Sequence, residues 1–264
     1  MHRANPHNCY IPTRLDNIRN TGVANSHPLD YDRNLNSGIS ERVHMANYVL
    51  IHGAGDVGWY WHLVAAELEK AGHTVVAPDM PVEGESATLN DYATAVVDAI
   101  DDKQNLIVVA QSFGGFVAPI VASRTNARLI VTVAAMIPVP GESGMGMFEN
   151  NPTGQEPQED TSDIALFLHD VPRALAEEAL SKGKNQAGTG FSDPWPLAAW
   201  PDIPTKSIIG TIDRVFPVAW LRKITEDRIG VTPDEIETGH CVALAKPVEL
   251  ARMLEAYREE AGIS

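Results

Sequence analysis

The stretch that decides the fold is Leu106-Ile107-Val108-Val109-Ala110-Gln111-Ser112-Phe113-Gly114-Gly115. Its first five residues are all apolar, which predicts a strand that is buried on both faces. The residues that follow, 114–123, predict a helix. Because Ala110 and Gly114 have small side chains, a tight turn between strand and helix can form at Ser112 without a collision. The stretch therefore predicts a strand–turn–helix unit that presents a serine beyond the end of a buried strand.

The same alternation of apolar strands and helices continues on both sides of this unit. Continuously apolar strands are typical of a mostly parallel sheet with helices on both faces, so the predicted fold class is α/β. Gly72 is expected to end the first helix. Binding sites in such folds lie beyond the carboxyl ends of the strands. The expected strands are 48–51, 74–77, 106–110, 129–135, 206–210 and 234–237, and the expected helices are 59–71, 89–100, 114–123, 218–227 and 247–261.

The chain of 264 residues has the length of one domain with an added segment. Residues 1–44 contain no lysine and no periodic apolar pattern, so we expect an extension that is disordered or loosely packed. It is either a docking arm or a stretch that precedes a functional start at Met45. Residues 45–264 are expected to form the single folded domain.

Between residues 141 and 200 the alternation lapses, and we expect an insertion that covers the strand ends as a cap. The stretch 145–163 is rich in Gly, Pro, Gln and Glu and is expected to form a loop. Two short helices are expected at 163–168 and 172–180, with Asp170 capping the second. The alternative to a cap is a flexible surface excursion.

The composition argues against several classes of partner. There are 20 Lys and Arg residues against 35 Asp and Glu residues, so the formal net charge is −15. Nucleic acids and anionic membrane surfaces attract basic proteins, so neither is an expected partner. The two cysteines, Cys9 and Cys241, lie far apart in the chain and do not indicate a disulfide framework. With no long apolar run and no secretory signal pattern, the expected location is the cytoplasm.

A serine needs a base beside it to act as a nucleophile, and the base needs a carboxylate to orient it. In parallel-sheet enzymes of this kind the order along the chain is Ser, then Asp or Glu, then His. Asp213 follows the fifth expected strand, and His240 follows the last one. We therefore assign Ser112, Asp213 and His240 as a catalytic triad, with Glu142 as the alternative acid. The competing interpretations are a helix-capping serine and a solvent-exposed loop histidine.

Acyl transfer also requires hydrogen-bond donors for the oxyanion that develops. The loop His52-Gly53-Ala54-Gly55 follows the first strand and can direct the Ala54 N–H toward the serine. The Phe113 N–H, directly after the serine at a helix N-terminus, is the second expected donor. His52 is expected to brace this loop rather than to take part in the chemistry.

Motifs for metal or nucleotide binding are missing from the sequence. There is no His-Glu-x-x-His or Cys-x-x-Cys, and no Gly-x-Gly-x-x-Gly or Walker loop follows a strand. Cys241, beside His240, is expected to be a small packing residue rather than a nucleophile. We therefore expect neither a metal nor another cofactor.

Together these segments resemble the α/β-hydrolase family, from Met45 to about Ala261. More narrowly, they resemble the branch that holds plant methyl-ester esterases and hydroxynitrile lyases, with their bacterial relatives. The resemblance implies an α/β-hydrolase fold with a small helical cap and a Ser–Asp–His hydrolase that needs no cofactor. Besides the turn at Ser112, the matching segments are 49–54, 58–61, 72–79, 167–172 and 239–240.

Two positions distinguish this sequence from the lyases of that branch. Those lyases carry a Lys directly after the catalytic His, and a Thr after the His of the first loop, where this chain has Cys241 and Gly53. Without that positive charge the site lacks a means of stabilising an anionic leaving group. Both positions favour an ester hydrolase, and a cofactor-free lyase or a non-catalytic ligand-binding receptor are the alternatives.

The expected function is hydrolysis of a small, moderately apolar carboxylic ester or lactone. The expected partner is that small-molecule substrate, and the sequence leaves a homodimer open. For each candidate wall of the substrate pocket, packing in the core is the alternative. The candidate walls are Gly53, Trp59, Met136, Phe148, Phe167, Phe191 and Trp195.

Overall fold

Strand β3 (Leu106–Gln111) lies inside a six-stranded sheet with the order β2-β1-β3-β4-β5-β6. The computed structural model describes residues 45–101, 104–151, 160 and 162–264, and the extension expected at 1–44 lies outside them. All neighbouring strands of this sheet pair in parallel, so the predicted α/β fold class is confirmed. The other strands are β1 (Asn47–Ile51), β2 (Thr74–Val76), β4 (Ala127–Val133), β5 (Thr205–Gly210) and β6 (Asp234–Ile236).

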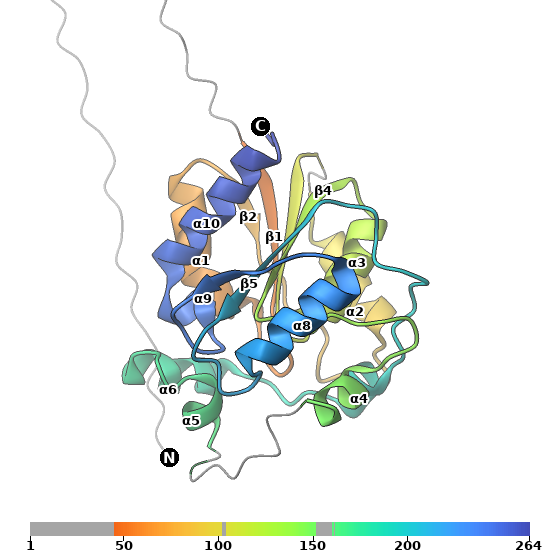
Figure 1. Cartoon of the computed structure of the whole chain (residues 1–264), viewed down its shortest axis with the longest axis vertical. Coiled ribbons are helices and arrows are strands. Elements are labelled where there is room, and N and C mark those ends of the chain that lie inside the picture. The colour runs from red at the N-terminus through yellow and green to blue at the C-terminus, as the bar shows by residue number, and fades with distance from the viewer. Residues whose placement is uncertain (1–44, 102–103, 152–159, 161) are drawn as a thin grey trace, which may run out of the picture. The chain divides into compact units, whose positions relative to one another are not determined.

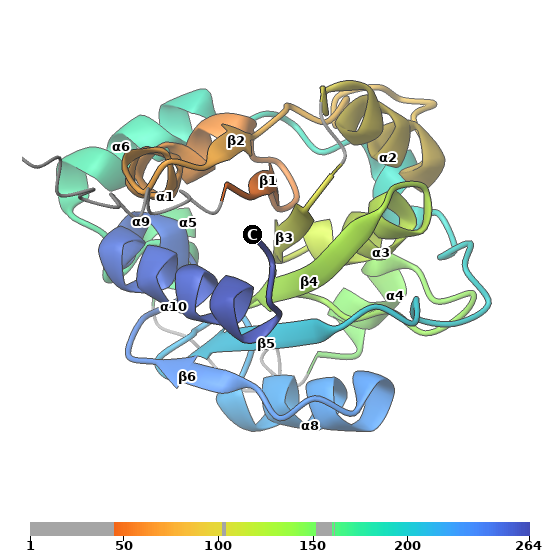
Figure 2. The ribbon, with the colours of Figure 1, turned by 90° about the horizontal axis from the view of Figure 1, so that it is seen from above.

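Helices cover both faces of the sheet, as Figure 1 and the view from above in Figure 2 show. One face packs against η1 (Gly58–Trp61), α1 (His62–Lys70), α9 (Val242–Ala245) and α10 (Pro247–Glu260). The opposite face packs against α2 (Leu89–Asp98), α3 (Gly114–Ser123) and α8 (Val218–Ile229).

Along each strand, successive side chains pack alternately against one helix layer and against the other. Leu50 and Val109 belong to the apolar cluster on the side of α1 and α10, whereas Ile51 and Val108 belong to the cluster around α2, α3 and α8. All four side chains are fully buried. Because both faces are covered, the strands are continuously apolar instead of alternating with polar residues. Burial of each such side chain contributes about 1.5–3 kcal/mol, so the centre of the sheet contributes substantially to the stability of the fold.

Strand β4 ends two residues earlier than the sequence predicts. The apolar run continues to Ala135, but β4 stops at Val133 because Ala134 has a φ of +44°, a left-handed conformation that cannot continue a strand. Small apolar side chains give no sign of such a turn. Gly72 has a φ of +93° and ends the first helix as predicted.

The described part of the chain between β4 and β5 carries four short helices: α4 (Gly144–Glu149), α5 (Asp163–Phe167), α6 (Arg173–Lys182) and α7 (Gly188–Ser192). Figure 1 shows α4, α5 and α6 at the same end of the sheet.

Two sequence predictions for this segment are wrong. The loop expected at 145–163 begins as helix α4, because the Ser143 hydroxyl accepts the Gly146 N–H at 3.1 Å and caps it. Asp170 does not cap α6, whose N-cap is Pro172, because the Asp170 carboxylate accepts hydrogen bonds from Thr238 and Gly239 instead.

Gly115 shows how closely α3 packs against the chain that follows β4. A Cβ atom at Gly115 would lie 2.0 Å from the Met136 carbonyl oxygen, and backbone cannot move aside as a flexible side chain can. We expect Gly115→Ala to lower the free energy of unfolding by about 1–3 kcal/mol, measured by urea denaturation.

Gly188→Ala is the matched control, since no atom lies within 4 Å of an added Cβ at this helical position. It should leave the free energy of unfolding unchanged or raise it by up to about 1 kcal/mol. Equal losses in the two variants would contradict this account of the packing.

Candidate active site

Ser112 lies in the turn between β3 and α3 with a left-handed backbone, φ +50°. Such a conformation costs on the order of 1–3 kcal/mol for a residue other than glycine, so its surroundings must hold it. The Ser112 N–H donates to the Val133 carbonyl at 3.3 Å, and the Ser112 carbonyl accepts the N–H groups of Gly115 and Met136, both at 3.0 Å. These hydrogen bonds tie the turn to α3, to the end of β4 and to the segment that follows β4.

His240 and Asp213 form a buried pair. His240 Nδ1 lies 2.9 Å from Asp213 Oδ2, and the two side chains are 2% and 0% exposed. Asp213 Oδ1 accepts the N–H groups of Val215 at 2.7 Å and Phe216 at 3.0 Å, which fixes the orientation of the carboxylate. With a carboxylate as acceptor, Nδ1 carries the imidazole proton and Nε2 keeps a free lone pair. His240 can therefore accept a proton through Nε2.

The His240 ring is also held in place by its neighbours. Phe167 from α5 and Phe216 from the loop before α8 contact it edge-on, with ring centroids at 5.6 and 5.1 Å. Gln111, at the end of β3, donates a hydrogen bond of 3.5 Å to the His240 carbonyl. These contacts reduce the rotational freedom of the imidazole, so its Nε2 keeps one direction.

Glu142, the alternative acid, lies in a different environment. Its Oε2 is 2.5 Å from Arg228 Nη1, its Oε1 is 3.2 Å from Arg228 Nη2, and it also accepts the Val139 N–H at 3.2 Å. The carboxylate that faces the imidazole is that of Asp213.

The loop after β1 brings backbone donors to the same place. A Cβ atom on Gly53 would lie 3.5 Å from the Ser112 hydroxyl oxygen, so this loop passes directly over the serine. Within the described residues, neither the Ala54 N–H nor the Phe113 N–H donates to another protein group. Ala54 lines the cavity described below, whereas Phe113 is fully buried.

His52 braces this loop from within the core. It is fully buried, its Nε2 accepts the Met80 N–H at 3.0 Å, and its Nδ1 lies 2.8 Å from the Gly53 carbonyl. One nitrogen therefore accepts and the other donates, as in a neutral imidazole. Burial lowers the pKa of His52, which agrees with that state.

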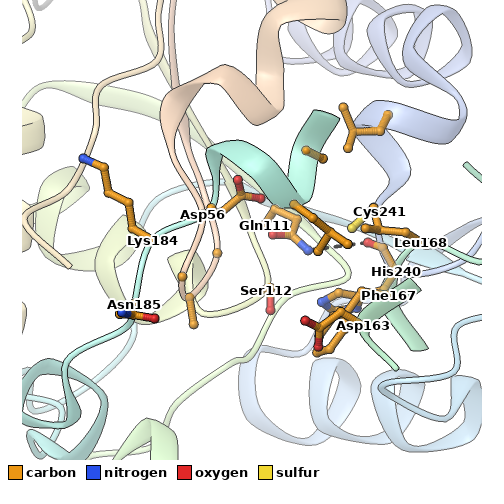
Figure 3. A pocket seen from close by; sticks show the side chains of 17 residues that line it. Asp56, Gln111, Ser112, Asp163, Phe167, Leu168, Lys184, Asn185, His240 and Cys241 are labelled. Carbon is orange, nitrogen blue, oxygen red and sulfur yellow. Dashed lines mark hydrogen bonds between the residues drawn. The ribbon is translucent and has the colours of Figure 1, made fainter. Parts of the chain in front are cut away.

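Ser112 and His240 open into one cavity of about 410 Å³ at the carboxyl ends of the strands (Figure 3). Its wall combines the loop after β1, the end of β3, cap residues from α5 and α6, and the loop around His240. The remaining lining residues are Gly53, Ala54, Gly55, Asp56, Gln111, Asp163, Phe167, Leu168, Ala179, Leu180, Gly183, Lys184, Asn185, Cys241 and Leu244.

Of the residues expected to form the pocket, Gly53 and Phe167 line this cavity. The other five do not line the cavity. Met136 and Trp195 are buried in the core. Trp59 stacks on a neighbouring ring, Phe191 packs against another phenylalanine, and Phe148 lies between two aromatic rings while 43% exposed.

Asp170 and His169 connect the cap to the loops that carry Asp213 and His240. Asp170 Oδ2 accepts both the Thr238 hydroxyl and the Gly239 N–H at 2.7 Å, and His169 Nε2 lies 3.0 Å from the Ile212 carbonyl. The contacts join segments that are far apart in sequence. The spacing of residues along the chain gives no signal for them.

A comparison with protein-family models matches residues 48–253, which is more than half of the chain, to the alpha/beta hydrolase family. The chain belongs to the alpha/beta hydrolase family.

Relatives of this α/β hydrolase include enzymes of different names. It is 36% identical over 114 residues to a carbendazim hydrolyzing esterase of Nocardioides sp. (strain SG-4G), a match covering 39% of this chain and 47% of that one. The chain therefore spans about half the length of that relative. It is 25% identical over 265 residues to norfluorocurarine synthase 1 of Strychnos sp, covering 81% and 96%.

Among solved structures, the hydrolase is similar to an extracellular α/β-hydrolase from a Paenibacillus species. The TM-score is 0.67 at 22% identity, covering 80% of this chain and 98% of that chain. At this level of identity, the likeness supports the fold alone.

The environment of Cys241 disfavours a role for this cysteine as the nucleophile. Cys241 is buried, and burial raises the pKa of its thiol well above the ordinary value, which disfavours a thiolate nucleophile.

In the described parts of the hydrolase no group of three or more His, Cys, Asp or Glu side chains is placed to hold a metal ion. None of the described helices is long and apolar enough to cross a membrane.

The geometry predicts how the site reacts with a fluorophosphonate, which labels activated serines. We expect the probe to label Ser112, and Asp213→Asn to slow labelling by roughly 10⁴-fold, since an amide cannot orient the imidazole or stabilise its charge as the carboxylate does. Intact-mass spectrometry over time measures the rate.

Glu142→Gln is the matched control, because it makes the same carboxylate-to-amide change outside the His240 contact. It should be labelled within about threefold of the wild-type rate, because Glu142 pairs with Arg228 and not with the imidazole. A slow Glu142→Gln and a fast Asp213→Asn would reverse the assignment of the acid.

Proposed function

We propose that this α/β hydrolase cleaves a small, moderately apolar carboxylic ester or lactone through Ser112, His240 and Asp213. The observation that carries the proposal is the buried His240–Asp213 pair, which opens into the same cavity as a serine on a strained turn. A serine nucleophile, a base and an orienting carboxylate are the groups that acyl transfer requires.

The reaction begins when Ser112 Oγ attacks the ester carbonyl carbon and its proton passes to His240 Nε2. The carbonyl π electrons move to oxygen, and the Ala54 and Phe113 N–H groups stabilise that oxyanion. As the tetrahedral intermediate collapses, the C–O bond breaks and His240 gives its proton to the leaving alkoxide. Water then repeats these steps on the acyl-enzyme, releasing the acid and restoring Ser112.

Asp213 acts on the base rather than on the substrate. Its buried carboxylate holds the Nδ1–H tautomer of His240 and stabilises the imidazolium that forms when Nε2 takes the proton. Because both groups are almost fully shielded from water, their attraction is stronger than at a surface.

The comparisons support hydrolysis only in part. Several relatives are named esterases, and one of them matches over 79% of this chain and 95% of its own. A relative named a synthase matches over a similar share of both chains. Family membership by itself does not select a reaction, since one fold hosts many chemistries. The residues of the cavity therefore carry the proposal.

A lyase of the hydroxynitrile type is disfavoured at two positions. Cys241, in place of a lysine, supplies no positive charge for a leaving anion. The Gly53 position has little room for a threonine, because its Cβ would lie 2.5 Å from Gln111 Oε1 and 3.0 Å from Ser112 Cβ.

The proposal is tested by removing the nucleophile and the base. Ser112→Ala and His240→Ala should each lower kcat for a p-nitrophenyl ester by about 10⁶-fold, the scale reported for members of such triads, since the attack then lacks nucleophile or base. Release of p-nitrophenol measures the rate.

Ser123→Ala, a serine at the other end of α3, is the control and should keep wild-type kcat. Activity retained in Ser112→Ala would refute the proposed nucleophile. Cyanide release from a cyanohydrin, without turnover across a panel of esters and lactones, would favour the lyase instead.

A further inference from the structure

Asp56 is a carboxyl group in the wall of the cavity that holds Ser112 (Figure 3). It lies in the loop between β1 and η1, half-buried, and its Oδ1 accepts the Val57 N–H at 2.9 Å. Among the ion pairs of the described residues, none includes Asp56. The mechanism proposed above does not use this group.

We propose that Asp56 is a specificity residue that selects esters carrying a protonated amine, which it binds through a charge-assisted hydrogen bond. This inference rests on the proposed esterase function and names its substrate class. The amine would lie on the part of the substrate that faces the β1–η1 loop, away from the scissile bond.

The path of the loop limits how far the amine can be from the reacting carbon. Gly53 lies against Ser112, and Asp56 follows it by three residues. Since consecutive Cα atoms are about 3.8 Å apart, the Cα atoms of Gly53 and Asp56 are at most about 11 Å apart. A chain of five or six carbon atoms between carbonyl and nitrogen spans a distance of this order.

In the part of the chain that the structure describes, no cationic side chain pairs with the Asp56 carboxylate. Burial raises its pKa to about 6, and the nearby negative charge of Asp79 adds to the rise, while the Val57 N–H bond lowers it. Lys184 lines the same cavity, but its ammonium lies 3.5 Å from Asp79 and 3.9 Å from Glu83. A ligand cation would relieve this destabilised carboxylate and gain its attraction.

A purely local role for Asp56 is the alternative. Its bond to the Val57 N–H is of the kind by which Asp and Asn side chains stabilise turns. Asparagine keeps an oxygen that can accept this bond and loses only the charge. Asp56→Asn therefore separates recognition of a cation from support of the loop.

The experiment compares matched pairs of esters. The first pair is the methyl esters of an ω-aminohexanoic acid and of heptanoic acid, and the second pair is aminopentyl acetate and hexyl acetate. Together they place the amine on the acyl side and on the alcohol side. Release of acid, followed by titration at constant pH, gives kcat/KM for each ester with the full chain.

In at least one pair, Asp56→Asn should lower kcat/KM for the amino ester by roughly tenfold to a hundredfold, the usual value of a hydrogen bond to a charged group. The neutral ester should change by less than about threefold, which also shows that the variant is folded. The loss should appear mainly in KM, because the contact is equal in the ground and transition states.

Two further variants test where the effect arises. Glu69→Gln removes a negative charge from the exposed face of α1. It should leave the ratio of kcat/KM for the amino ester to kcat/KM for the neutral ester unchanged. Asp163→Asn removes the other carboxylate of the cavity wall. If Asp163→Asn lowers the ratio as much as Asp56→Asn does, the preference comes from the general charge of the cavity and the assignment to Asp56 is overturned.

The dependence on pH gives a second readout. Below about pH 6 Asp56 is protonated and above it is charged, so the ratio of kcat/KM for amino and neutral esters should rise between pH 5 and pH 7. Any effect of pH on the catalytic steps that the two esters share cancels in this ratio of kcat/KM values. In Asp56→Asn the ratio should stay flat.

Other titratable groups lie around Asp56. Tyr60 and Cys241 are neutral over this range because burial raises the pKa of both, and the Lys184 ammonium lies 3.5 Å from the Asp79 carboxylate. A ratio that rises equally in the wild type and in Asp56→Asn would overturn the inference.

The outcomes distinguish this inference from the proposed function. Wild-type turnover of a neutral ester that Ser112→Ala abolishes supports the esterase alone. If amino and neutral esters then respond equally to Asp56→Asn in both pairs, the specificity role is wrong and the esterase stands. If the wild type cleaves none of the four esters, the esterase proposal fails for these chain lengths and the inference falls with it.

Discussion

The close packing of backbone around Ser112 is the constraint on which the rest of the site depends. A serine in a left-handed turn is costly, and here the loop after β1, helix α3 and the segment after β4 all approach it closely. A side chain at Gly53 or Gly115 would collide with this arrangement. Because the same loop carries the Ala54 N–H, the packing that holds the turn also sets the position of this proposed oxyanion donor relative to the serine.

The cap has two roles in this arrangement. Phe167 and Leu168 close one side of the cavity, and the next two residues, His169 and Asp170, hydrogen-bond to the loops that carry Asp213 and His240. A change in the cap would therefore alter both the shape of the cavity and the orientation of the imidazole. This coupling gives a physical reason why sequence changes in a cap can affect turnover as well as substrate choice.

Part of the acidic composition of the chain lies in the wall of the cavity. A net charge of −15 usually serves solubility, and by itself it only disfavours anionic partners. Asp56 and Asp163 place part of that charge on the cavity wall, and the lysine of this wall is already paired with other carboxylates. The chain as a whole and the cavity wall both carry negative charge, so both favour cationic over anionic ligands.

The sequence by itself determined the parallel sheet, the turn at Ser112 and the strand ends that carry Asp213 and His240, because strand burial and tight turns leave local patterns in composition. Only the tertiary structure decided that Asp213, rather than Glu142, faces the imidazole, and that five of the expected wall residues pack elsewhere. The tertiary structure also showed that Asp170 does not cap a helix but accepts the Gly239 N–H in the loop that carries His240. An apolar or charged residue type predicts burial or exposure, but its partner depends on how distant segments of the chain meet in space.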